Sequence, residues 1–233
     1  MKLESRIVHE ASFQFADNRV VVQLHGDSQN PFALPALHRQ ETVRRNARDR
    51  GEFVVYRVKE PVVTGATDSS RKKPFSTEPA ETIKFEYPDM RHDAETLMVH
   101  PQTGDIYILS KRISGAAGVY KLPAAAGYKT DKMNRLEKIA DFSAPAMPNG
   151  LLTGGDISPD GTRVAICDYF GGYEIVMPAG KSKNFDEIWK EKPSTIELGE
   201  RRQGETVAYT ADGKAILATS EKKNSPVIKV DRK

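Results

Sequence analysis

Tight-turn signals recur in this chain about every fifty to sixty residues, each between short runs of β-type residues. The three turns are centred on Gly104, Gly161 and Gly213, and an aspartate precedes the last two. An Asx-Gly pair supplies the positive-φ residue that a tight hairpin needs. A recurrence of this length indicates an array of similar units, such as a propeller or a solenoid.

Each unit is predicted to contain four short strands. The strands of two complete units are predicted at residues 95–99, 106–109, 119–122 and 136–142, and at residues 153–158, 164–166, 173–176 and 195–198. A last unit has three predicted strands, at residues 205–209, 215–218 and 227–230. Upstream, residues 53–58 and 83–87 are predicted to be the third and fourth strands of an earlier unit. Residues 12–24, with a turn at Asp17-Asn18, would supply its first two strands.

The chain is therefore predicted to be all-β, a β-propeller of four-stranded antiparallel blades. Neighbouring blades must cover each other's faces, which explains why the middle strands are apolar. Six blades of about fifty residues need roughly 300 residues, so we expect the 233 residues here to form about four blades of a six-bladed type, an incomplete ring. We assign residues 46–233 to the blades and residues 1–45 to a divergent N-terminal segment that can form part of a first blade.

Helical signals are almost absent. Residues 184–190 predict one short turn of helix, with Asn184 as its N-cap. Residues 61–81 are rich in Pro, Ser, Thr and Lys and predict an exposed loop between two strands of one blade. Shorter loops are predicted at residues 124–128 and 145–150.

From Asn46 onward, several stretches resemble a family of uncharacterised bacterial proteins with a six-bladed, TolB-like or NHL-like propeller. The matching stretches are residues 46–48, 55–61, 87–89, 91–95, 101–105, 119–123, 153–161, 204–205, 220–221 and 225–226. The resemblance implies the fold and no particular activity. It also implies an export signal and earlier blades, which this chain does not display, so we interpret the first part of the chain as truncated or divergent.

Charge, cysteine content and the lengths of the apolar runs exclude several classes of protein. The 35 basic and 32 acidic residues leave a net charge of +3, and the basic residues are scattered, so no nucleic-acid partner is expected. Cys167 is the only cysteine, which excludes an intramolecular disulfide and a thiolate metal cluster. No apolar run approaches the ~18 residues of a membrane span, and residues 1–17 contain no apolar core of a signal peptide. We expect a soluble protein and leave its compartment open, because the family that it resembles is usually exported.

Four acids fall at or within the predicted first strands, which line the central channel of a propeller. If Asp93, Glu95, Asp156 and Glu205 converge, their oxygens suit Ca²⁺ or Mg²⁺. The competing interpretation is that these acids accept hydrogen bonds from backbone amides and pair with neighbouring basic groups. His92, Lys111 and Glu221 are further candidates for the channel.

Two functions remain open at this stage. The first is a non-catalytic module that binds a protein, peptide or glycan, because no nucleophile elbow, zinc-binding histidine pair or phosphate loop occurs. The second is a metal-dependent hydrolase of lactonase or phosphoesterase type, with the four acids at its centre. Whether the protein is an enzyme is therefore undecided.

Overall fold

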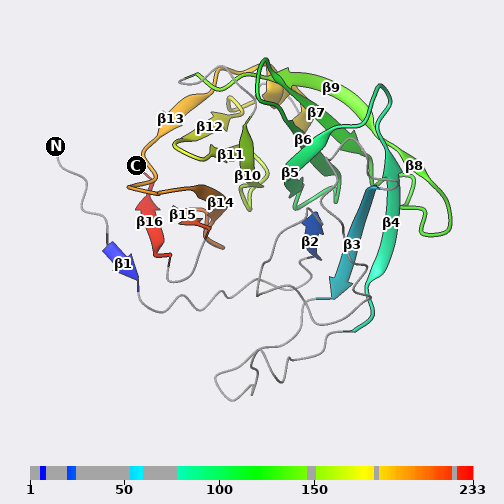
Figure 1. Ribbon diagram of the computed structural model, residues 1–233, viewed down its shortest axis with the longest axis horizontal. Helices are drawn as coiled ribbons and strands as arrows, with labels where there is room; N and C mark the ends of the chain where they lie inside the picture. The colour runs from blue at the N-terminus through cyan, green and yellow to red at the C-terminus, as the bar shows by residue number, and fades with distance from the viewer. Residues whose placement is uncertain are drawn as a thin grey trace.

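The computed structural model describes residues 6–8, 20–24, 53–59, 78–145, 151–180, 184–221 and 225–232. These residues form four sheets of four strands each. The sheets are arranged as blades around a common centre, with β2, β5, β10 and β14 innermost (Figure 1). The predicted all-β propeller of about four blades is confirmed.

The blades follow one another along the chain, except that β8 of the first blade lies between two strands of the second and that β1 of the fourth blade comes first. The first consists of β2 (Val20–Leu24), β3 (Phe53–Lys59), β4 (Glu81–Glu86) and β8 (Asn134–Arg135). The second consists of β5 (Asp93–Val99), β6 (Ile106–Lys111), β7 (Ala117–Leu122) and β9 (Glu137–Phe142). The third consists of β10 (Leu152–Ile157), β11 (Arg163–Asp168), β12 (Gly172–Val176) and β13 (Ser194–Ile196). The fourth consists of β14 (Gly204–Tyr209), β15 (Ala215–Ser220), β16 (Val227–Asp231) and β1 (Arg6–Val8).

The strands predicted for the second, third and fourth blades are confirmed, with small changes of boundary. Two assignments in the first blade are wrong by one place. β3 and β4, predicted to be third and fourth, are second and third, because β2 occupies the inner position and β8 pairs in parallel with the outer edge of β4. The predicted turn at Asp17-Asn18 and most of the predicted loops at residues 61–81 and 145–150 lie outside the described residues.

An unpredicted strand completes the fourth blade. β1 pairs antiparallel with β16, and Ile7 lies opposite Ile228. The two ends of the chain therefore share one sheet (Figure 1). β1 and β2 both come from the first 45 residues, and each pairs with a strand from the rest of the chain.

Apolar side chains fill the spaces between successive blades. In β6, Ile106 and Ile108 face the first blade while Tyr107 and Leu109 face the third, and all four are at most 2% exposed. Period-two alternation sends successive side chains to opposite faces of a strand. A strand covered on both faces is therefore apolar throughout, and each fully buried side chain contributes about 1.5–3 kcal/mol. This packing explains the apolar middle strands of the repeat.

The predicted short helix is present as a 3₁₀ helix, η2 (Phe185–Lys190), between β12 and β13. Asn184 is its N-cap, as predicted, and its side-chain oxygen accepts a hydrogen bond from the Asp186 amide at 3.1 Å. η2 buries Phe185 and Ile188 in the core between the second and third blades. Among the described residues, no helix has the length and apolar character needed to cross a membrane.

Candidate functional site

The inner strands of three blades share a β-bulge near their starts. Pairing with the second strand of the blade skips Glu95 in β5, Thr153 in β10 and Glu205 in β14. A bulge leaves one residue outside the ladder and re-aims its side chain. Two glutamates predicted as site residues, Glu95 and Glu205, thus occupy equivalent positions.

The same register identifies a second set of equivalent residues. Ser110, Asp168 and Ser220 pair with the residue that precedes each bulge. The residues that follow them are Lys111, Tyr169 and Glu221. In each of these blades, the bulged residue and the residue that follows the second set therefore lie at the same end of the blade, where the inner strand begins.

These positions bring six polar residues together, which we call the axial cluster: Glu95, Lys111, Tyr169, Gln203, Glu205 and Glu221. Lys111 Nζ lies 2.6 Å from Glu95 Oε2 and 2.6 Å from the Tyr169 hydroxyl. Gln203 Nε2 donates to Glu205 Oε1 at 3.1 Å and to Glu221 Oε2 at 2.6 Å. Side chains from the second, third and fourth blades thus meet at one end of the molecule.

The electrostatics of the axial cluster are unbalanced, because its six residues carry three carboxylates and one ammonium group. Burial raises the pKa of Glu205, and the neighbouring charges of Glu95 and Glu221 raise it further. Burial lowers the pKa of Lys111, but its hydrogen bonds with Glu95 and Tyr169 outweigh this effect and hold the pKa above its usual value. The cluster therefore favours additional positive charge.

Three predicted site residues lie outside this cluster. Asp156 Oδ2 accepts a hydrogen bond from the Tyr209 amide at 2.8 Å, and Oδ1 accepts one from the Ile157 amide, so this aspartate satisfies backbone groups. Asp93 begins β5, where it pairs with Lys111 in the ladder between β5 and β6.

His92 belongs to an aromatic group between the first and second blades. Its Nε2 lies 2.6 Å from the Tyr120 hydroxyl and 3.0 Å from Asp89 Oδ1. Its ring packs edge-on against Tyr87, with 4.9 Å between ring centroids. His92 is 9% exposed, so it contributes to the packing between blades rather than to the axial cluster.

Sequence reasoning missed Tyr169 and Gln203. Tyr169 was detectable, because the repeat register aligns it with Lys111 and Glu221. Gln203 lies in the loop before β14, and only its contacts in the folded chain reveal it.

No group of three or more His, Cys, Asp or Glu side chains is arranged to hold a metal ion in the described ranges. Within the axial cluster, Glu95 accepts a hydrogen bond from Lys111 and Glu205 accepts one from Gln203. Cys167 is fully buried, and burial raises the pKa of its thiol. Glu95 and Glu205 therefore present charge and hydrogen-bonding groups rather than a formed coordination sphere.

Large apolar side chains are exposed in the loops at the same end of the blades. Ile113 is 86% exposed and follows Lys111 by two residues. Phe170 is 67% exposed and follows Tyr169 directly. Met90, in the loop that leads into β5, is also 67% exposed. The acidic axial cluster is thus accompanied by apolar side chains.

No family model and no curated protein matches this chain. The structure is similar to that of TolB from Acinetobacter baumannii, at 17% identity and a TM-score of 0.44, over 77% of this chain and 35% of that one. It is also similar to the PQQ-bound form of an aldose sugar dehydrogenase from Streptomyces coelicolor, at 9% identity and a TM-score of 0.40, over 77% and 58% of the two chains. A putative TolB from Agrobacterium tumefaciens gives 17% identity and a TM-score of 0.38, over 76% and 51%. This chain covers 35–58% of these three solved chains, and the assignment of the fold rests on the four sheets described above.

Proposed function

We propose that this protein is a non-catalytic binding module that holds a basic, partly apolar segment of a partner protein or peptide against the axial cluster. The observation that supports this proposal is the grouping of Glu95, Glu205 and Glu221 in the axial cluster, where Lys111 pairs with Glu95 while Gln203 bridges the other two carboxylates. A lysine or arginine from a partner supplies the missing positive charge, and charge complementarity of this kind steers association and sets specificity.

The exposed apolar side chains favour a macromolecular partner over a lone ion. The side chains of Ile113, Phe170 and Met90 are exposed at the same end as the axial cluster. Burying their apolar surface against a partner would be favourable. Phenylalanine and methionine are enriched at protein interfaces. A glycan has no basic group for the three carboxylates, so it fits this end of the molecule less well.

Fluorescence anisotropy with two labelled peptides tests the proposal. One peptide alternates lysine with leucine, and the other alternates glutamate with leucine. We expect saturable binding of the lysine peptide only, weakened by added salt, and at least tenfold weaker binding in the Glu95→Gln/Glu205→Gln double variant.

The matched control is Glu187→Gln, which removes an exposed carboxylate on η2, away from the cluster. This variant should bind as the wild type does. Equal binding of both peptides, or an unchanged affinity in the double variant, would overturn the proposal.

A metal-dependent hydrolase of lactonase or phosphoesterase type is the second candidate. The observation that favours it is the proximity of Glu95 and Glu205, whose like charges a divalent cation neutralises. Melting curves with Ca²⁺, with Mg²⁺ and with a chelator separate the two candidates. A Tm that rises with either ion and falls on chelation supports the metal site, and three identical curves support the binding module.

We also propose that the four blades belong to the six-bladed TolB-like or NHL-like family. The motif at residues 153–161, together with the blade length of about fifty residues, supports this proposal. A crystal structure of the natural gene product tests it, since a ring of any number of blades other than six contradicts it.

A further inference from the structure

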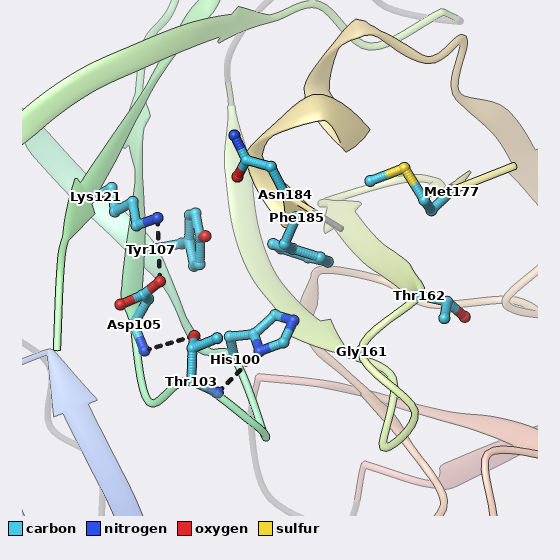
Figure 2. Close-up of a pocket in the computed structure, with 10 residues that line it drawn as sticks. All are labelled: His100, Thr103, Asp105, Tyr107, Lys121, Gly161, Thr162, Met177, Asn184 and Phe185. Atoms are coloured by element: carbon cyan, nitrogen blue, oxygen red, sulfur yellow. Dashed lines mark hydrogen bonds and ion pairs between the residues drawn. The ribbon is translucent and has the colours of Figure 1, made fainter. Parts of the chain in front are cut away.

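A cavity of about 240 Å³ lies between the second and third blades (Figure 2). Its lining includes His100 and Gly161, from the turns that join the first and second strands of their blades. The axial cluster lies where the inner strands begin, so the cavity is at the opposite end of the blades. It is below the range of about 300–1,000 Å³ that drug-sized ligands occupy, which restricts it to a smaller molecule.

One wall of the cavity is a fixed array of charged groups. Lys121 Nζ lies 3.0 Å from Asp105 Oδ2 and 2.9 Å from Asp186 Oδ2, and both the lysine and Asp105 line the cavity. The same nitrogen lies 3.2 Å from Asp186 Oδ1, so its three N–H donors are directed at the two carboxylates. The Tyr107 hydroxyl donates to Asp186 Oδ1 at 2.6 Å. A carboxylate accepts about four hydrogen bonds, so Asp105, which accepts from Lys121 and the Ala124 amide, retains capacity to accept from a hydroxyl group.

The opposite wall is apolar and held in place. The Phe185 ring packs against His100, with 4.4 Å between centroids, and against Tyr107 at 5.4 Å. Met177 extends the apolar lining (Figure 2). Burial lowers the pKa of His100, and its Nδ1 accepts hydrogen bonds from two backbone amides. The histidine therefore adds no positive charge near neutral pH.

At the interface between the third and fourth blades, side chains fill the space that corresponds to this cavity. The repeat register places Glu174 of β12 where Lys121 lies in β7. The Tyr209 hydroxyl donates to Glu174 at 2.8 Å, and Arg232 Nε lies 3.1 Å from the same carboxylate. Tyr209 is 5% exposed, so side chains occupy the space between the third and fourth blades. Between the second and third blades, η2 provides the wall and the space stays open.

We propose that this cavity binds one neutral monosaccharide unit, whose hydroxyl groups contact Asp105 and Thr162 and whose apolar face packs on Phe185. Two aspartates against one lysine disfavour an anionic ligand. A cationic ligand would compete with Lys121, which already lies between the two carboxylates. A ring that has both hydroxyl groups and an apolar face matches the polar wall and the aromatic wall together.

Trp189 provides the signal for the experiment. It is the only tryptophan of the chain, lies in η2 and is 6.3 Å from the Tyr107 ring, centroid to centroid. Glucose, galactose, mannose and N-acetylglucosamine are titrated while Trp189 fluorescence and saturation-transfer NMR are recorded. We expect saturable binding of at least one sugar, and at least tenfold weaker binding in Asp105→Asn and in Thr162→Val, which alter opposite sides of the cavity.

Two controls separate this site from other effects. Lys190→Gln changes the exposed side of η2, where Lys190 pairs with Glu187, and should leave sugar binding unchanged. Glu205→Gln alters the axial cluster and should also leave sugar binding unchanged. The sugar titrations therefore test this inference independently of the proposed function. No saturation with any of the four sugars up to about 50 mM, or wild-type affinity in both folded cavity variants, overturns the inference. Stronger binding of inorganic phosphate or putrescine than of every sugar also overturns it.

Discussion

Lys111 of the second blade contacts Tyr169 of the third, with 2.6 Å between the ammonium nitrogen and the phenol oxygen and 4.6 Å between that nitrogen and the ring centroid. The two residues hold equivalent positions in the repeat. Equivalent positions of adjacent blades lie side by side, so a repeated register creates a contact between blades. Lys111 also binds Glu95 of its own blade, so one ammonium group joins two blades.

Lys111→Met should lower the free energy of unfolding by about 1–2 kcal/mol, because Glu95 loses the donor at its Oε2. Glu95→Gln keeps an acceptor and should cost less. Chemical denaturation of both variants and of the double variant measures the coupling energy. A coupling energy of zero would show that the ion pair contributes nothing to stability.

Glu205→Gln should stabilise the protein at neutral pH. The pKa of Glu205 is raised in the folded state from an ordinary value of 4.5, so the folded chain holds this proton more tightly than the unfolded chain. In the wild type, protonated Glu205 contributes stability that is fully present below about pH 4.5 and is lost as the pH rises through the folded pKa. We expect the Tm of the variant to exceed that of the wild type by about 2 °C at pH 7.5 and to match it near pH 4. The same difference at both pH values would contradict this prediction.

His100→Ala should cost about 2–3 kcal/mol of folding free energy, because two backbone amides lose their acceptor and Phe185 loses a packing partner. His100→Ser should cost about 1 kcal/mol less. The equivalent residue of the third blade is Ser158, whose hydroxyl accepts hydrogen bonds from the amides of Thr162 and Arg163. Urea denaturation at pH 7.5 compares the two variants, and equal losses would rule out a capping role for residue 100.

The titration of His100 gives a separate prediction. Burial lowers its folded pKa below the ordinary 6.5, so the neutral form contributes stability above pH 6.5 that is lost as the pH falls through the folded pKa. Between pH 7 and pH 5 the wild type should lose more stability than His100→Ser does. Parallel pH profiles of the two proteins would be inconsistent with this shift.

Gly154→Ala should destabilise the contact between the third and fourth blades. A Cβ at this position would lie 2.7 Å from the Glu205 carbonyl oxygen and 3.2 Å from the Thr206 Cα, and the backbone of β14 cannot move aside without breaking its ladder. We expect a loss of about 2 kcal/mol or more. Gly171→Ala is the matched control, since its nearest neighbour would be 3.5 Å away, and it should change stability by at most about 0.5 kcal/mol. Thermal melts of both variants make the comparison.

The local features of the fold were predictable because they depend on short-range chemistry. Turns at Gly161 and Gly213 have positive φ at glycine, as their sequences indicate. Asn184 caps η2 because its side chain reaches an amide two residues ahead. Short runs of β-type residues bounded by turns identified the strands, and their recurrence identified blades. The order of the strands within the first blade was misjudged because β3 and β4 carry no local mark of their distance from the centre.

The candidate site was predictable in part for the same reason. Glu95 and Glu205 were found because they recur at one position of the repeat, and that position is a bulge in the structure. Asp156 has the same charge and lies shortly after the equivalent position of its own blade, but its carboxylate accepts two backbone hydrogen bonds. Sequence alone does not separate these roles, because the identity of an acid does not reveal its hydrogen-bond partners.

The sequence by itself determined most of the strands, the turns, the approximate number of blades and the three clustered acids, because each depends on residues close together in the chain. Only the tertiary structure decided that β1 completes the sheet of β16, that Gln203 joins Glu205 to Glu221, and that η2 leaves a cavity beside Lys121. Each of these depends on distances between segments that are far apart in sequence or on the space left between packed side chains. Packing of the whole chain fixes those distances, and no local pattern encodes them.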